Sequence, residues 1–501
     1  MLAGATCAIS VPVGTVLAWL LWRTDLPGRR VGIVLLAIML FVPLYLQAAA
    51  WRAGFGLQGW IVLNTGCPAW LDEGWPGAIW IHSMVAIPWV VLIAGVGMRL
   101  VEPELEEQAL LDGSAGQVFW HVTLPRALPT IGVATLWVAI LTAGEMTISD
   151  LFRIRTYAEE VYTRVAVGPQ VGEGPLAVTP GVVLTAGLVL AALVLCGKLM
   201  LGGRPLTLRR RWVFRLGRWR WPLAIPAGLA LVAIIGVPVG SLCYKAGVAV
   251  TTDDAGWPMR SWSAWKSLAV TGTSPWYDRR ELGWSLLLGT LASTAAVALA
   301  VPLAWLARMK QGNAGFRFSR RSLGTLAVLA LVALCLAVPG PVVGVLMIRL
   351  LNRPELPPLV WLYDQSIFAP WLALLIRCLP PAVLVMWYAS QTIPVEILDA
   401  AAIDGAGPMQ RLFRIALPNR LAALALAWVI ATAVALGDLA ASILVVPPGV
   451  ETLSILIHRR LHSGVEHEVA GTCLAQFAIF AIVAAAALWL ANRWSRRMNA
   501  G

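Results

Sequence analysis

Charged side chains are scarce in this chain of 501 residues: 13% are charged, whereas 59% are apolar and the mean hydropathy is +0.77. A soluble protein has too little interior to bury that much hydrocarbon. The composition therefore predicts an integral membrane protein. Loops make up what remains outside the apolar segments, which excludes a separate soluble catalytic domain.

Cysteine is also scarce, and no two cysteines form a Cys-x-x-Cys pair. Most fall inside apolar segments, so we expect buried thiols with no disulfide framework or cysteine metal site. The seven cysteines are Cys7, Cys67, Cys196, Cys243, Cys335, Cys378 and Cys473. A Gly-x4-Gly-Lys-Ser/Thr loop for nucleotide phosphates is absent, because Leu199 follows the one Gly-Lys pair. We therefore expect no enzyme, no catalytic residue and no cofactor on this chain.

Eleven apolar stretches are long enough to cross a hydrocarbon core of ~30 Å as helices. They predict an all-α fold, a polytopic transmembrane helical bundle of about 11 spans. The stretches are 3–22, 31–50, 77–98, 129–148, 178–200, 222–243, 283–306, 323–348, 369–390, 421–446 and 471–491.

Basic residues are distributed unevenly between the two sides of these spans. With the C-terminus in the cytoplasm, 24 of the 38 Lys and Arg residues lie inside, 13 lie outside and Arg377 lies within a span. The positive-inside rule then predicts a multi-pass protein of the inner (plasma) membrane with a cytoplasmic C-terminus. Lipid headgroups account for the net charge of +12, so no nucleic-acid partner is expected.

The two halves of the chain repeat each other. Short motifs recur 292 or 293 residues apart: Asp112-Gly113 and Asp404-Gly405, Leu124-Pro125 and Leu417-Pro418, Gly144-Glu145 and Gly437-Asp438. Matching spans lie six apart, an even number, so the repeat is parallel. We predict a first domain of five spans at 1–203, a basic cytoplasmic linker at 204–221 and a second domain of six spans at 222–501. The first domain lacks a counterpart of the span at 222–243, through a shortened first half or a start further upstream.

Two loops on the predicted cytoplasmic side resemble each other. The first runs from Glu102 to Pro125 and the second from Pro394 to Pro418. Each is expected to contain a short helix with a proline and acids in its first turn, ending at a glycine. A second short helix would lead to Leu-Pro, where the chain turns into the next span. Compact exposed helices of this kind suit contact with a separate protein that drives movement.

These loops resemble the EAA loop, Glu-Ala-Ala-x3-Gly-x9-Ile-x-Leu-Pro, of binding-protein-dependent ABC importer permeases. Two copies in one chain are similar to the fused permeases of ferric-iron and thiamine importers. The resemblance implies that each loop docks into a cleft of an ATP-hydrolysing subunit and that the glycine permits the turn. The docking residues it implies are Glu107, Ala109, Gly113, Leu124, Pro125, Asp399, Ala400, Ala401, Gly405, Ile415, Leu417 and Pro418.

The first loop departs from this pattern more than the second. It has Gln108 for the first Ala and Val122 for Ile. Eight rather than nine residues separate Gly113 from Val122. The second loop has Asp399 for Glu and keeps the nine-residue spacing to Ile415. We also align Phe119 with Phe413. These departures predict that the first docking contact is looser or tilted.

The resemblance further implies partners and cargo. Two copies of an ABC ATPase subunit would carry ATP and Mg²⁺, and an external substrate-binding protein would deliver the solute. The external segment 144–165 mixes acids with Arg153, Arg155 and Arg164 and is similar to that of iron-type fused permeases, which favours ferric iron as the substrate. Thiamine, phosphonates, polyamines and sulfate stay open as alternatives.

Ionisable residues inside spans are energetically costly and point to a pathway. Glu145 and Asp438 occupy the same repeat position, so we expect them to face each other across the pseudo-twofold axis. They would attract a cation or gate the pore, or else cap and pack helix ends. Arg377, close to Pro380-Pro381, would meet carbonyls freed by a proline kink or serve a structural role. His82 is expected at the outer interface.

Two other classes of protein stay open. An ion-coupled secondary transporter would also be helical and duplicated, but it predicts helices broken at the membrane midplane, and the paired loops argue against it. A membrane-embedded enzyme would need a metal cluster or an activated nucleophile. His458, His462 and His467 lie near Glu466 and Glu468, yet an exposed loop accounts for them, so no metal site is predicted.

Overall fold

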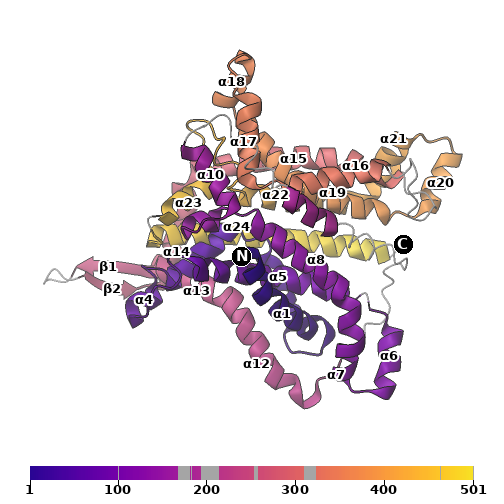
Figure 1. The fold of residues 1–501 in the computed structure, drawn as a ribbon, viewed down its shortest axis with the longest axis horizontal. Coiled ribbons are helices and arrows are strands. Elements are labelled where there is room, and N and C mark those ends of the chain that lie inside the picture. The colour runs from indigo at the N-terminus through magenta and orange to yellow at the C-terminus, as the bar shows by residue number, and fades with distance from the viewer. Residues whose placement is uncertain are drawn as a thin grey trace. The chain divides into compact units, whose positions relative to one another are not determined.

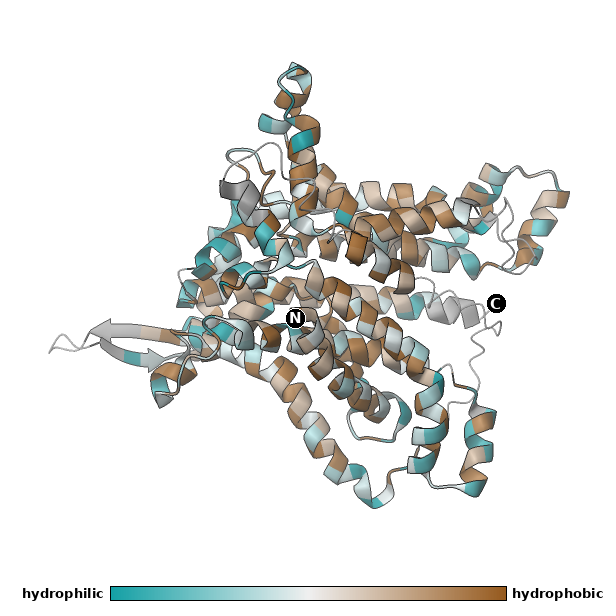
Figure 2. Cartoon of the chain, in the orientation of Figure 1, coloured by the Kyte–Doolittle hydropathy of each residue, from teal (hydrophilic) through white to brown (hydrophobic). Residues whose placement is uncertain are grey.

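A computed structural model describes residues 1–99, 101–167, 181, 183–192, 214–252, 258–309, 323–462 and 464–499. Helices dominate these ranges and form the all-α bundle that the composition predicted (Figure 1). Hydrophobic residues cover the long helices (Figure 2). Helices suit a bilayer because each pairs its own backbone N–H and C=O groups. Of the predicted basic linker, positions 204–213 lie outside the described residues.

In the part of the chain that the structure describes, eight helices are long and apolar enough to cross a membrane, and each overlaps one predicted span. They are α1 (Leu2–Arg23), α5 (Trp75–Arg99), α8 (Leu124–Ala143), α12 with α13 (Arg220–Leu231 and Val237–Gly247), α15 (Arg279–Met309), α19 (Phe368–Gln391), α22 (Leu421–Gly437) and α24 (His467–Asn499). The π-turn η3 (Val232–Gly236) joins α12 to α13.

Two further predicted spans are bent helix pairs. The pair formed by α2 (Arg29–Met39) and the helices beginning at Leu44 is bent by 109°, and the pair formed by α16 (Leu323–Ala337) and α17 (Gly340–Leu351) by 102°. Pro43 and Pro339 stand directly before the second helix of each pair. Proline lacks the N–H that would continue a helix and restricts the residue before it. The expectation of one helix across 31–50 and across 323–348 is corrected by these breaks.

Among the described residues the span count is eight, or up to ten with the bent pairs, so the predicted count of about eleven is not confirmed. The eleventh predicted span, 178–200, lies largely outside the described residues, although Val183–Ala192 is an apolar helix. A β-hairpin is an addition to the predicted fold: β1 (Val248–Thr252) pairs antiparallel with β2 (Pro258–Trp262).

Shorter elements connect the spans. The helices are α3 (Leu44–Phe55), α4 (Trp60–Thr65), α6 (Pro103–Asp112), α7 (Ala115–Val118), α9 (Thr147–Leu151), α10 (Tyr157–Val167), α14 (Ala264–Tyr277), α18 (Pro357–Asp364), α20 (Val395–Ile403), α21 (Pro408–Gln410) and α23 (Leu453–His462). Short 3-10 and π turns are η1 (Phe119–Thr123), η2 (Gly217–Trp219), η5 (Arg411–Ala416) and η6 (Pro418–Arg420).

The chain divides into two compact units, and each draws on both halves of the sequence. Unit 1 consists of Met1–Glu160, Val183–Asp278 and Ile457–Ala478; unit 2 consists of Val161–Val182, Arg279–Leu456 and Ile479–Gly501. The segments exchanged between the halves, Val161–Val182 and Ile457–Ala478, lie at nearly equivalent positions of the repeat. The predicted domain boundaries refer to the repeat in sequence and stay a prediction, whereas the segments of the two compact units alternate along the chain.

Small residues bring the helices of each unit close together. In unit 2, Ala296 of α15, Ala382 of α19 and Ala431 of α22 are fully buried in one apolar cluster. In unit 1, a Cβ added to Gly14 of α1 would lie 2.6 Å from the Val90 side chain of α5, so only glycine fits there. Such residues let backbones approach, which is how helices associate in lipid.

The cysteines follow the prediction in part. Cys378 and Cys473 are buried thiols, whereas Cys196 lies outside the described residues. Cys243 is exposed, which corrects the expectation of burial. It lies on α13, and the segment Gly217–Gly247 is the least buried of the eight candidate spans at 17%, so few protein neighbours surround it.

Candidate functional site

The first loop folds as two short helices, as the sequence pattern predicted. α6 has Pro103 in its first turn, where a missing N–H leaves no gap in the helix, and α7 and η1 continue into α8 (Figure 1). The Ser114 N–H donates a hydrogen bond of 2.8 Å to Oε1 of Gln117, which fixes the start of α7.

The second loop repeats this construction in unit 2. α20 and α21 lie beyond the end of α19, and η5 and η6 lead into α22 (Figure 1). The Gly407 N–H donates a hydrogen bond of 3.0 Å to Oε1 of Gln410. Gln117 and Gln410 are 293 residues apart, so the two copies use the same side chain for the same purpose.

The glycines of the two loops differ in conformation. Gly405 has a φ of 83°, in the left-handed region, and the following Ala406 N–H returns to the Ala401 carbonyl at 2.9 Å to close α20. Gly113 has a φ of −151°, which any residue can adopt. The turn that the resemblance ascribes to glycine therefore requires glycine at Gly405 alone.

Glu106 anchors the first loop, and the sequence analysis missed it. Its carboxylate is fully buried, pairs with the guanidinium of Arg23 at the end of α1, and accepts a hydrogen bond of 2.6 Å from the Thr123 hydroxyl. Leu398 and Ala416 occupy the equivalent positions in the second loop and are buried in an apolar cluster. An ion pair in one copy thus takes the place of apolar packing in the other.

Exposed apolar side chains recur at matching positions of the two loops. Leu111 and Ile403, each directly before Asp-Gly, are 86% and 87% exposed. Trp120 and Phe413, each four residues before the Leu of Leu-Pro, are 65% and 59% exposed. Large exposed apolar groups mark contact surfaces in soluble parts of a protein.

The repeat alignment near the aromatic residues needs a correction. We aligned Phe119 with Phe413, but Phe119 is buried and its structural counterpart is the buried Leu412. The exposed counterpart of Phe413 is Trp120. The one-residue difference between the loops therefore lies closer to Gly113 than expected.

The docking residues implied by the resemblance fall into three groups by exposure. The exposed residues are Glu107, Pro125, Asp399, Ala400, Gly405 and Pro418. The half-buried residues are Ala109, Gly113, Leu124, Ile415 and Leu417, whereas Ala401 is buried. A docking partner therefore meets the acids, Ala400 and the prolines directly, while Ala401 packs the loop against its own unit.

Glu145 and Asp438 both cap the chain that follows their helices. Glu145 accepts hydrogen bonds from the N–H groups of Thr147 and Ile148 at 2.8 and 2.9 Å, at the start of α9. Asp438 accepts one from the Ala441 N–H at 3.1 Å. Capping, one of the two predicted roles of these residues, is thus present in each unit. Their pairing across the pseudo-twofold axis stays a prediction.

Arg377 finds its carbonyl partner between two other helices. Its Nε lies 3.3 Å from Oδ1 of Asp438, and its Nη1 donates to the Val338 carbonyl at 3.4 Å. Val338 stands directly before Pro339, at the break between α16 and α17. The freed carbonyl therefore belongs to the bent pair, and α19 itself runs unbroken through Pro380 and Pro381.

His82 is buried inside unit 1. Only 4% of it is exposed, and its Nε2 lies 4.0 Å from Oε2 of Glu145. The expectation that His82 lies at the outer interface is corrected, because α5 turns this side chain toward the loop that begins α9.

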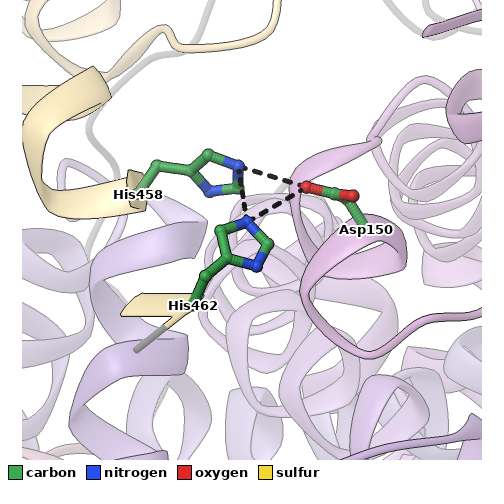
Figure 3. A group of neighbouring side chains, drawn as sticks. All are labelled: Asp150, His458 and His462. Carbon is green, nitrogen blue, oxygen red and sulfur yellow. Dashed lines mark hydrogen bonds and ion pairs between the residues drawn. The ribbon is translucent and has the colours of Figure 1, made fainter. Parts of the chain in front are cut away.

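Three metal-ligating side chains converge elsewhere in unit 1 (Figure 3). His458 and His462 of α23 both point at Asp150 of α9. Burial opposes ionisation of Asp150, but hydrogen bonds from the two imidazoles outweigh it and hold the pKa of this carboxyl below its ordinary value. The grouping differs from the sequence expectation, which placed His467, Glu466 and Glu468 beside the two histidines.

Comparison with known proteins finds a family match over less than half of the chain. Residues 284–500 match the binding-protein-dependent transport system inner membrane component. This part of the chain is similar to the permeases of ABC importers. The predicted resemblance to binding-protein-dependent permeases is thereby confirmed for these residues, whereas the loop motif and the resemblance to ferric-iron and thiamine importers stay predictions. With the apolar helices, the family match establishes a multi-pass inner-membrane protein.

Individual permeases are similar over shorter stretches. The chain is 32% identical to the sulfate transport system permease protein CysW of Escherichia coli (strain K12) over 27% of this chain and 47% of CysW. It is 31% identical to the molybdenum transport system permease protein ModB of Haemophilus influenzae over 24% of this chain and 55% of ModB. The putrescine transport system permease protein PotI of Escherichia coli (strain K12) is 28% identical over 38% of this chain and 63% of PotI. The chain thus spans about half the length of CysW and ModB, and none of the three names includes iron or thiamine.

Proposed function

We propose that this protein is the permease subunit of an ABC importer, with both halves contributing to one solute pathway. The observation that carries the proposal is the repetition of one exposed surface in two loops of a permease chain. Leu111 and Trp120 in the first loop match Ile403 and Phe413 in the second, beside the acids Glu107 and Asp399. Two surfaces with matching residues suit two copies of one partner.

The proposed partner is an ABC ATPase subunit, one copy for each loop. It would carry ATP and Mg²⁺, and the permease would make no covalent chemistry. Each loop runs directly into a span, α8 or α22, and the first is tied to α1 by Glu106 and Arg23. A movement of the loop is therefore transmitted to the spans, because no flexible linker separates them.

The two ATPase contacts are proposed to be unequal. Gly113 is extended, Gly405 is left-handed, and the first loop is one residue shorter. The exposed aromatic residue therefore follows the glycine at a different distance in each loop, which supports the prediction of a tilted first contact. An external substrate-binding protein would deliver the solute on the side opposite the loops, with the C-terminus in the cytoplasm.

The substrate proposal remains a small solute, with ferric iron as the first candidate because of the charged segment 144–165. Similar permeases carry sulfate, molybdenum and putrescine in their names, so anions and polyamines are the competing candidates. Thiamine is a further candidate from the fused permeases.

An ion-coupled secondary transporter is the second candidate function, and one observation favours it: both bent pairs are broken helices. The permease match and the paired loops weigh more heavily, because broken helices by themselves do not identify the energy source.

The test is uptake into vesicles that contain the purified chain with and without candidate ABC ATPases. ATP-dependent uptake of one solute from a panel of ferric iron, thiamine, sulfate, molybdate and putrescine is the expected result. Uptake driven by an ion gradient without any ATPase would instead establish the secondary transporter.

A further inference from the structure

We propose that Asp150, His458 and His462 form a binding site for one divalent transition-metal ion, with Zn²⁺ as the probe. The site lies within unit 1 and does not depend on the transport function proposed above. It contradicts our expectation from sequence that the chain holds no metal site.

The three ligand atoms already have the spacing of a metal shell. Nε2 of His458 lies 3.2 Å from Oδ2 of Asp150, Nε2 of His462 lies 3.4 Å from the same oxygen, and the two Nε2 atoms are 3.4 Å apart. Tetrahedral Zn²⁺ with bonds of ~2.0–2.1 Å separates its ligands by about 3.3 Å. The three atoms thus stand at three corners of a tetrahedron.

Hydrogen bonds alone do not satisfy all three atoms of this triangle, Oδ2 of Asp150 and Nε2 of His458 and His462. If both neutral imidazoles carry a hydrogen on Nε2, both donate to Asp150 and the two N–H groups face each other. If one does, the other Nε2 turns a lone pair toward the carboxylate. A cation at the centre accepts all three lone pairs at once, so it resolves the conflict that every arrangement of protons on neutral rings retains.

Rigid elements hold the ligands in place. Histidines four residues apart share one face of α23, and Arg460 on the same helix pairs with Asp278 at 3.1 Å. Arg52 donates to the Leu461 carbonyl at 3.3 Å. On the other side, Glu145 caps the α9 helix that carries Asp150. Ligands on such supported elements need little rearrangement to bind a metal.

The donor set and the exposure select the kind of ion. Two imidazoles and one carboxylate suit Zn²⁺ and its neighbours in the first transition series rather than Ca²⁺ or Mg²⁺, which prefer oxygen. His458 is buried, whereas the His462 side chain is 48% exposed and that of Asp150 27%. The fourth position therefore opens to water, and the ion joins α23, from the second half of the sequence, to α9, from the first.

The test is Zn²⁺ binding to the purified full chain, with any affinity tag removed and metal stripped by a chelator. Titration calorimetry and elemental analysis after dialysis should give one Zn²⁺ per chain. Asp150→Asn and His462→Ala should each weaken binding at least tenfold. His467→Ala is the matched control, because this nearby histidine lies outside the triangle, and it should bind as the wild type does.

A folding defect is separated from a lost ligand by measuring each variant's elution volume and thermal unfolding without metal. X-ray absorption at the zinc edge should show two imidazole nitrogens. The proposal is overturned if the wild type retains no stoichiometric Zn²⁺, or if folded His462→Ala and His467→Ala bind it equally.

Discussion

At the scale of single residues, the buried position of Glu106 is occupied by a charged side chain in the first repeat and by an apolar one in the second. The buried carboxylate of Glu106 needs Arg23 and Thr123, whereas Leu398 and Ala416 achieve burial without charge. The sequence did not reveal this, because an acid in a predicted cytoplasmic loop reads as a solvated side chain. Arg23, over 80 residues away, was counted only as a basic loop residue.

Removing one partner of this ion pair should be costly. Glu106→Ala leaves the Arg23 guanidinium buried without a counter-charge, and we expect a loss of about 3–5 kcal/mol in the free energy of unfolding. Chemical denaturation in detergent measures it. The double variant Arg23→Met, Glu106→Leu imitates the second loop and should recover most of the loss. A double variant no more stable than Glu106→Ala would show that charge pairing is not what holds the loop.

The two loop glycines offer a matched pair of substitutions. Gly405→Ala forces a Cβ into the left-handed region at a cost of about 1–2 kcal/mol, although open space surrounds it. Amide hydrogen exchange in 395–407 should accelerate about 5–30-fold. Gly113→Ala, at an extended position, should leave exchange in 103–118 nearly unchanged. Equal acceleration in both loops would contradict the assigned conformations.

At the scale of elements, long apolar runs predicted where helices lie but not where they break. Hydropathy is continuous across Pro43 and Pro339, so 31–50 and 323–348 each read as one span. Pro380 and Pro381 carry the same signal, but α19 continues through them as one helix. Neighbouring helices decide which prolines break a helix, and sequence alone does not contain that packing.

Arg377 of α19 pairs with Asp438, which follows α22. Removing the arginine should therefore lower stability by leaving the Asp438 charge without a partner. Arg377→Met leaves Asp438 buried beside the break of the bent pair and should lower the free energy of unfolding by about 2–4 kcal/mol. Adding Asp438→Asn should restore part of the stability, because the orphaned charge disappears. Denaturation of the single and double variants forms the test. Additive losses would exclude the pairing.

At the scale of the whole molecule, the duplication was readable from the sequence because its motifs are local and evenly offset. The loop helices, their prolines and the Asp-Gly endings all followed from it. The exchange of Val161–Val182 and Ile457–Ala478 between units did not, nor did the approach of His458 to Asp150 across more than 300 residues. Tertiary contacts of this range leave no periodic trace in a single sequence.

The central claim is that two loops receive two copies of an ATPase, and capture of that partner tests it most directly. The chain is purified in detergent with candidate ABC ATPases, as wild type and as the double variant Leu111→Asp, Ile403→Asp. Both side chains are almost fully exposed, so the substitutions should leave the fold intact. Leu356→Asp, on the predicted external side, is the control for an exposed apolar residue.

We expect two ATPase subunits per wild-type chain, unchanged capture by Leu356→Asp, and at least tenfold weaker capture by the double variant with a normal elution volume. Each single variant should retain about one subunit. No ATPase bound to the wild type, or equal capture by the double variant, would contradict the claim that these loops are the coupling surface.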